Sequence, residues 1–134
     1  MKKILICGTR VLPNRSYAVA VVNELDHRIG FNPNIITFSD DMIGQGRKSF
    51  WCTIIHGACP NSADEYADLW AKANNIPVQA FPATSGNYLA RNIEMVAQAD
   101  ELIAFWDGFS YGTAHTIAHA AKKGIPIKII TVKK

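Results

Sequence analysis

The sequence predicts an α/β fold, a three-layer domain with a central, mostly parallel sheet of five strands. Five short apolar runs alternate along the chain with segments whose apolar residues recur at helical spacing. The runs are continuous rather than alternating in polarity, which is typical of parallel strands covered by helices on both faces. At 134 residues the chain fits one domain, which we assign to residues 1–134.

The predicted strands are the five apolar runs. Several of them end next to a glycine, such as Gly8 or Gly57, where a tight turn can follow. In chain order the strands are Ile4–Cys7, Trp51–Ile55, Val78–Phe81, Leu102–Trp106 and Ile125–Val132.

Four helices are predicted between the strands: Ser16–Ile29, Ser62–Ala73, Asn87–Ala99 and a last one that ends at Gly124. The second has the clearest start, because Ser62 and Glu65 have the spacing of a capping box. Helical spacing predicts the inward-facing residues, in chain order Val19, Val22, Leu25, Ala63, Tyr66, Ala67, Trp70, Leu89, Ile93, Val96, Ala114, Ile117, Ala118 and Ala121.

The regular alternation of strands and helices indicates a doubly wound, Rossmann-like sheet with right-handed crossovers. Residues 31–50 do not follow this alternation, because they contain Asn-Pro-Asn, Asp-Asp and Gly-Gln-Gly sequences. We interpret them as a long loop or insertion, in which Ile35–Phe38 could form a short extra strand.

Composition and charge argue against nucleic-acid-binding, disulfide-rich and membrane proteins. The net charge is only +3 and the basic residues are scattered, so nucleic acid is not an expected partner. The cysteines Cys7, Cys52 and Cys59 have neither metal-ligand spacing nor the even number of a disulfide framework, which indicates a reducing compartment. The apolar run after Lys2 and Lys3 is too short for a signal peptide or membrane span. We therefore expect a cytoplasmic protein without membrane contact.

The candidate site lies where three predicted strands run into helices. In an open parallel sheet, ligands bind beyond the carboxyl ends of the strands. The turns concerned are Gly8–Arg10, His56–Ser62 and Asp107–Thr113, each rich in glycine or hydroxyl residues. Helix N-termini attract phosphate and carboxylate groups, although any single strand-to-helix turn favours the same residues for structural reasons. The three turns together predict an anion site.

Individual residues of these turns allow more than one interpretation. Arg10 could bind a phosphate or be a solvated loop residue. His56 could contact a ligand or only a neighbouring loop. Asp64 lies in the first turn of its helix, which the helix dipole favours regardless of function. Asp107 could accept a ribose hydroxyl or act as an acid or base.

Two further sets of residues lie on helices. Arg91, beside Asn92, falls in the polar stripe opposite Leu89 and Ile93, which favours an ordinary surface arginine. His115 and His119 are four residues apart and could in principle hold a metal. No third ligand of matching spacing accompanies them, so no metal is expected.

Several short stretches, spread over nearly the whole chain, form a recognisable set. They are Gly8-Thr9-Arg10, His56–Pro60 followed by Ala63-Asp64, Phe81-Pro82-Ala83, Arg91-Asn92 with Met95, Phe105–Gly108, and then Ser110, Gly112-Thr113 and Thr116-Ile117. Together they resemble the YspA-like branch of the SLOG superfamily, which includes the Lonely-guy (LOG) phosphoribohydrolases and the DNA-processing protein DprA.

This resemblance implies a pocket for a nucleotide or nucleotide-derived ligand, such as an ADP-ribose- or NAD-like molecule, in a sensor or sequestering module. It further implies a homo-oligomer, for which the aromatic residues Phe31, Phe50 and Trp51 could mark a contact. No cofactor is expected. The ligand-binding residues would be Gly8, Thr9, Arg10, His56, Gly57, Ala58, Asp64, Arg91, Asn92, Asp107, Gly108, Ser110, Gly112 and Thr113.

The alternative is a phosphoribohydrolase-like enzyme that cleaves the N-glycosidic bond of a nucleotide, with Asp107 as acid or base and Arg91 holding the phosphate. The family's catalytic glutamate corresponds to Thr116, which cannot serve as a carboxylate. Binding is therefore favoured over catalysis. DNA binding by analogy with DprA is disfavoured by the mild charge and the lack of a basic stripe.

Overall fold

The computed structural model describes residues 2–10, 15–29, 52–84 and 86–132. The predicted extra strand Ile35–Phe38 and the aromatic residues Phe31, Phe50 and Trp51 lie outside these ranges. The elements are β1 (Lys2–Gly8), α1 (Arg15–Arg28), β2 (Cys52–His56), α3 (Ala63–Ala73), β3 (Val78–Ala80), α4 (Tyr88–Gln98), β4 (Glu101–Trp106), α5 (Tyr111–Lys123) and β5 (Ile127–Thr131).

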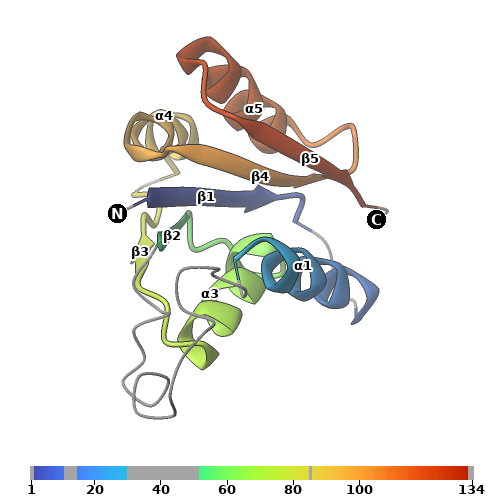
Figure 1. Ribbon diagram of the computed structural model, residues 1–134. Helices are drawn as coiled ribbons and strands as arrows, with labels where there is room; N and C mark the ends of the chain where they lie inside the picture. Colours follow the sequence, from blue (N-terminus) through green and yellow to red (C-terminus); the bar gives the residue numbers. More distant parts are fainter. Residues whose placement is uncertain (1, 11–14, 30–51, 85, 133–134) are drawn as a thin grey trace.

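The five strands form one sheet in the order β3-β2-β1-β4-β5, and every neighbouring pair is parallel. Helices α1 and α3 cover one face and α4 and α5 cover the other, which gives three layers (Figure 1). The predicted fold class is confirmed. The strand order reverses between β1 and β4, so the carboxyl ends of these two strands mark the place where such sheets bind ligands.

Each face of the sheet has its own hydrophobic core. Successive residues of β1 point to opposite faces, so Ile4 and Ile6 pack beneath α1 and α3, and Leu5 and Cys7 pack beneath α4 and α5. Phe105 of β4 is fully buried in the first of these cores. Burial on both faces explains why the middle residues of the central strands form continuous apolar runs.

Helix α4 presents a different face to the sheet from the one that helical spacing predicted. Leu89 and Ile93 are 40% and 46% exposed, so their assignment to the core was wrong. The buried side chains of this helix are Arg91, Asn92, Met95 and Val96. The inward face of α4 is therefore partly polar, which is possible because its polar groups form hydrogen bonds inside the protein.

Helices α1 and α5 also depart from their predicted orientations, α1 only in part. In α1 the predicted Leu25 is buried and Val22 packs half-buried against the core, but Val19 is exposed, and Tyr17 and Val21 are buried as well. In α5 the buried residues are Thr113, Thr116 and Ala120, whereas the predicted Ala114, Ile117, Ala118 and Ala121 are half-buried or exposed. Buried threonines are tolerated here because their hydroxyls find partners, as when Thr116 Oγ1 donates to the Gly112 carbonyl at 3.1 Å.

Helix α3 follows its predicted pattern most closely. Ala63, Ala67 and Trp70 are buried, and Tyr66 is half-buried. Ser62 caps the helix, with its Oγ accepting from the amide of Asp64 at 3.1 Å.

Candidate functional site

A cavity of about 380 Å³ opens at the carboxyl end of β1, between the starts of α4 and α5. Its volume falls within the range of small-molecule sites. The residues that line it are Cys7, Gly8, Arg10, Cys59, Asp64, Tyr88, Arg91, Asn92, Met95, Ser110, Tyr111, Gly112, Thr113 and Thr116.

The turn after β1 links two parts of the site. Thr9 is completely buried, and its Oγ1 accepts from the amide of Asp107 at 3.0 Å, which ties this turn to the one after β4. Its carbonyl accepts from the hydroxyl of Tyr17 at 2.8 Å, and that hydroxyl in turn accepts from the amide of Ala63 at 3.2 Å. Thr9 therefore supports the site without lining the cavity.

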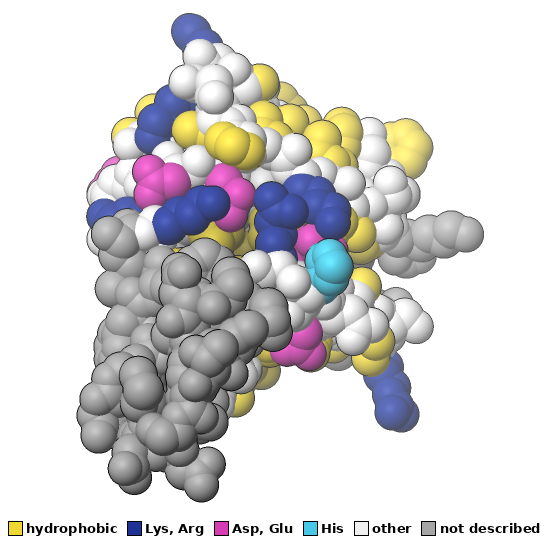
Figure 2. Space-filling view, in the orientation of Figure 1, with side chains coloured by type: hydrophobic (Ala, Val, Ile, Leu, Met, Phe, Trp, Pro, Cys, Tyr) yellow, Lys and Arg dark blue, Asp and Glu magenta, His cyan; other side chains and the backbone are white. Residues whose placement is uncertain are grey.

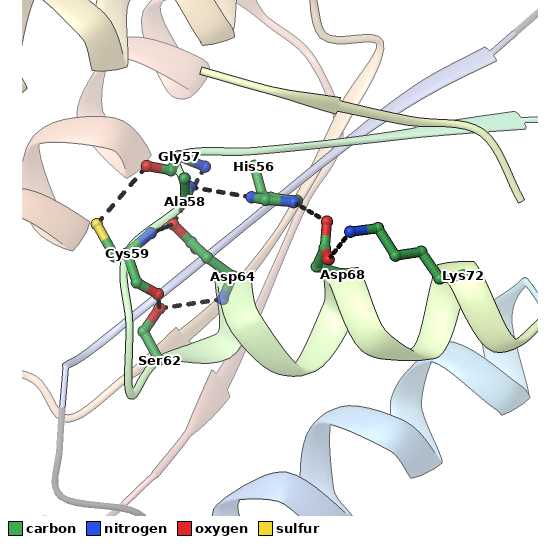
Figure 3. Close-up of polar contacts among 8 residues, drawn as sticks. All are labelled: His56, Gly57, Ala58, Cys59, Ser62, Asp64, Asp68 and Lys72. Carbon is green, nitrogen blue, oxygen red and sulfur yellow. Dashed lines mark hydrogen bonds and ion pairs between the residues drawn. The ribbon is translucent and has the colours of Figure 1, made fainter. Parts of the chain in front are cut away.

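The turn after β2 is organised around the buried carboxylate of Asp64 (Figure 3). Its Oδ2 accepts from the amides of Gly57 and Cys59 at 3.1 and 3.2 Å. Ala58 adopts a left-handed φ of 59° within this turn. Desolvation raises the pKa of Asp64, and the amide of Cys59 and the charges of His56 and Arg91 act in the opposite direction.

His56 makes its hydrogen bonds within the same region (Figure 3). Its Nδ1 accepts from the amide of Ala58 at 2.9 Å, so the proton of the neutral ring is on Nε2, which donates to Asp68 Oδ1 at 2.8 Å. Asp68 also pairs with Lys72. Desolvation acts to raise the pKa of Asp68, but the hydrogen bonds from Lys72 and His56 outweigh it and lower that pKa. Both ring nitrogens of His56 are thus used to hold the turn.

Arg91 is buried, and the surface position predicted for it was wrong. Its Nη1 donates to the carbonyls of Gly57 and Phe81, and its Nε donates to Asn92 Oδ1 at 3.0 Å. The remaining nitrogen, Nη2, lies 3.7 Å from Cys59 Sγ at the cavity. A Cβ atom on residue 57 would lie 2.7 Å from Cζ of Arg91, so only glycine leaves room for this guanidinium.

Arg10 approaches Cys59 as well. Its hydrogen bond with Cys59 is the largest cause of a raised guanidinium pKa, which desolvation opposes and a hydrogen bond with Tyr88 increases further. The ring of Tyr88 also lies over Arg91, with Cζ 5.6 Å from the ring centroid. Two guanidinium groups therefore meet at one end of the cavity.

The turn after β4 is shaped by Asp107. Its Oδ1 accepts from the amides of Phe109 and Ser110, both at 2.8 Å. Desolvation would raise the pKa of Asp107, but these amide bonds outweigh it and lower the pKa below its usual value. The side chain of Ser110 makes no capping hydrogen bond to α5, whose first residues line the cavity.

Asp107→Ala is expected to destabilise the protein by about 1–2 kcal/mol at pH 7, since two amides lose their acceptor. The pKa of Asp107 is lower in the folded than in the unfolded protein. Its contribution to the free energy of unfolding is therefore complete above the unfolded-state pKa of about 3.9 and is lost as the pH falls through the pKa of the folded state. Urea unfolding between pH 7 and pH 2.5 should show the two proteins converging at acid pH. Asp107→Asn keeps an acceptor and should retain most of the stability at pH 7. A constant difference across the pH range would contradict this role.

The structure divides the predicted site residues into two groups. Eight of them line the cavity: Gly8, Arg10, Asp64, Arg91, Asn92, Ser110, Gly112 and Thr113. The others hold the turns behind it or lie outside its lining: Thr9, His56, Gly57, Ala58, Asp107 and Gly108.

Six lining residues were not among the predicted ligand contacts: Cys7, Cys59, Tyr88, Met95, Tyr111 and Thr116. Tyr88 and Met95 lie three residues before and four residues after Arg91, on the same face of α4. That spacing would have identified both, had the buried face of α4 been assigned correctly.

Among the described residues, no three His, Cys, Asp or Glu side chains are grouped as metal ligands. The rings of His115 and His119 lie 4.5 Å apart between centroids, and the pKa of His115 is lowered mainly by desolvation and further by His119. No helix in the described ranges is long and apolar enough to cross a membrane.

Comparison with solved structures agrees with this architecture. The X-ray structure of TM1055 superposes with a TM-score of 0.63, covering 95% of this chain and 72% of that one at 16% sequence identity. The likeness shows the fold, a Rossmann-like α/β fold with a central parallel sheet.

The chain belongs to the same family as the Gene 61 protein of Mycobacterium phage D29. The two are 30% identical over 141 residues, which span 95% of this chain and 94% of the phage protein. No family model matches the sequence.

Proposed function

We propose that this protein binds a nucleotide or a nucleotide-derived ligand, such as an ADP-ribose- or NAD-like molecule, and acts as a sensor or sequestering module of the YspA-like branch. The observation that carries this proposal is the cavity between the start of α5 and the guanidinium groups of Arg10 and Arg91. The remaining expectations from the sequence, a homo-oligomer in the cytoplasm, are part of the same proposal.

The start of α5 supplies hydrogen-bond donors. The first amides of a helix have no partner within the helix, and the helix dipole is positive at this end. In α3 the amide of Asp64 donates to Ser62 Oγ and the amide of Ala63 donates to the hydroxyl of Tyr17, and the acidic residues Asp64 and Glu65 lie in the first turn. In α5 the first turn contains no acidic residue and has no side-chain cap, so its donors suit a phosphate group.

The charges of the cavity lining favour an anion. Arg10 and Arg91 carry full positive charges at neutral pH. Asp64 is the one carboxylate among the described lining residues, and two amides already bind its Oδ2. By contrast, acidic and basic side chains lie next to one another on the surface that Figure 2 shows.

The same geometry favours binding over hydrolysis. Glycoside hydrolysis requires an acid and a base within reach of the scissile bond. Thr116, at the position of the family's catalytic glutamate, donates its hydroxyl to the Gly112 carbonyl. Asp107 accepts from the amides of its own turn and has a lowered pKa, which makes it a poor proton donor at neutral pH.

Isothermal titration calorimetry against AMP, ADP-ribose and NAD tests the proposal. At least one of them should give saturable heat, and Arg10→Gln should weaken its binding about tenfold or more, because a charge-assisted contact is lost. Lys122→Gln, an exposed change in the last turn of α5, should leave the affinity unchanged.

The proposal fails if none of the three ligands gives heat at millimolar concentration. Chromatography of the same mixtures after prolonged incubation should show no free base. Release of base that depends on Asp107 would instead establish the hydrolase.

A further inference from the structure

A second cavity, of about 460 Å³, adjoins the first and is lined by residues from the starts of α4 and α5. Three residues, Tyr88, Tyr111 and Gly112, line both cavities and form the boundary between them. Residues 86, 87 and 89 complete the lining of the second cavity, which we call the annex. The two cavities are therefore direct neighbours, separated only by these three residues.

The annex differs from the first cavity in its chemistry. Its described lining contains no charged side chain, whereas Arg10 and Arg91 lie in the first cavity. Its side-chain surface is supplied mainly by the two tyrosine rings and by Leu89. The tyrosines are unusually open for large aromatic residues, at 47% exposed for Tyr88 and 69% for Tyr111.

We propose that the annex receives the planar aromatic ring of the ligand, next to the rings of Tyr88 and Tyr111, while the ligand's anionic group lies at Arg10 and the start of α5. This inference rests on the proposed function and adds which part of the ligand each cavity takes. An aromatic ring that enters the annex covers the exposed tyrosine surface, and stacking of this kind depends little on which base is present.

Tyr88 fixes the relation between the two subsites. Its ring lies over the guanidinium of Arg91, with Cζ 5.6 Å from the ring centroid, and its side chain lines both cavities. Tyr88 is thus in contact with the cationic part of the first cavity and also contributes surface to the annex. An anion and an aromatic ring at opposite ends of one ligand match this arrangement, and a sugar phosphate satisfies only half of it.

Binding of AMP and of ribose 5-phosphate, measured by calorimetry, tests this assignment. AMP should bind at least about tenfold more tightly, since stacking of one base on aromatic side chains is worth roughly 1–3 kcal/mol. Tyr111→Ala should weaken the binding of AMP but not of ribose 5-phosphate, and so remove most of the difference in affinity. Tyr111→Phe should keep the difference because the aromatic ring is retained.

Phe109→Ala is the matched control. Phe109 is an 87% exposed aromatic residue two positions before Tyr111, and it lines neither cavity, so AMP binding should not change. Equal affinities for AMP and ribose 5-phosphate would overturn the annex assignment and leave the anion site standing. The annex assignment would also be overturned if Tyr111→Ala weakened the binding of AMP and of ribose 5-phosphate by the same factor. If neither AMP nor ribose 5-phosphate binds, the annex assignment fails. If ADP-ribose and NAD also give no heat, the proposed nucleotide-binding function itself is wrong.

Discussion

Gly8→Ala is expected to lower the free energy of unfolding by about 3 kcal/mol, the cost of overpacking at a position where the neighbours cannot withdraw. A Cβ atom on this residue would overlap the hydroxyl of Tyr17 and lie 2.8 Å from the Cβ of Ala63 and 3.0 Å from the carbonyl of Phe105. The hydroxyl is fixed by its bonds to Thr9 and Ala63, so it cannot move without breaking both.

Urea unfolding followed by circular dichroism measures this change. Gly112→Ala is the internal control, because a Cβ atom there meets no other atom within 4 Å and alanine is the better helix former by about 1 kcal/mol. The control should therefore be as stable as the natural protein or slightly more stable. Equal stability of Gly8→Ala and the natural protein would show that the turn after β1 is not packed as described.

Arg91→Met is expected to cost about 3–4 kcal/mol of stability, since a buried donor is removed while its acceptors stay buried. The carbonyls of Gly57 and Phe81 and the Oδ1 of Asn92 would all lose the guanidinium. The same change should abolish binding of any nucleotide that the natural protein binds, because the turn that carries Cys59 would lose its connection to α4.

Glu94→Gln, an exposed change on the same helix, should alter neither stability nor binding. Arg91→Lys separates charge from geometry, because an ammonium group keeps the charge but cannot reproduce the planar set of donors. It should recover only part of the stability. If Arg91→Met unfolded at the same urea concentration as Glu94→Gln, Arg91 would not hold these loops together.

The order and type of the elements could be predicted because the strands are buried on both faces. Short continuous runs such as Ile4–Cys7, separated by helical segments, favour a covered parallel sheet, and the structure differs from the predicted bounds by only a few residues. The orientation of the helices could not be predicted as well. Spacing alone does not reveal that Arg91 and Asn92 find hydrogen-bond partners inside the protein. An orientation of α4 that buries Ile93 instead fits the helical period equally well.

The edge of the sheet at which the candidate site lies could also be predicted from the sequence. Parallel strands bring their carboxyl ends to one edge, so the turns beginning at Gly8, Gly57 and Asp107 had to be neighbours. Which residues line the cavity and which support it could not be predicted. Thr9, directly after β1, links two turns, whereas Thr113, in the first turn of α5, lines the cavity.

The reversed polarity of α4 has a consequence for how this helix is held in place. Contacts between apolar side chains are non-directional and allow a helix to turn about its own axis, whereas hydrogen bonds fix both distance and angle. Because Arg91 and Asn92 bond to Gly57, Phe81 and Gly112, the angular setting of α4 is determined by backbone carbonyls of three separate segments. That setting holds Tyr88 at the boundary between the two cavities, so the position of this ring depends on the polar side chains that α4 buries beside Met95 and Val96.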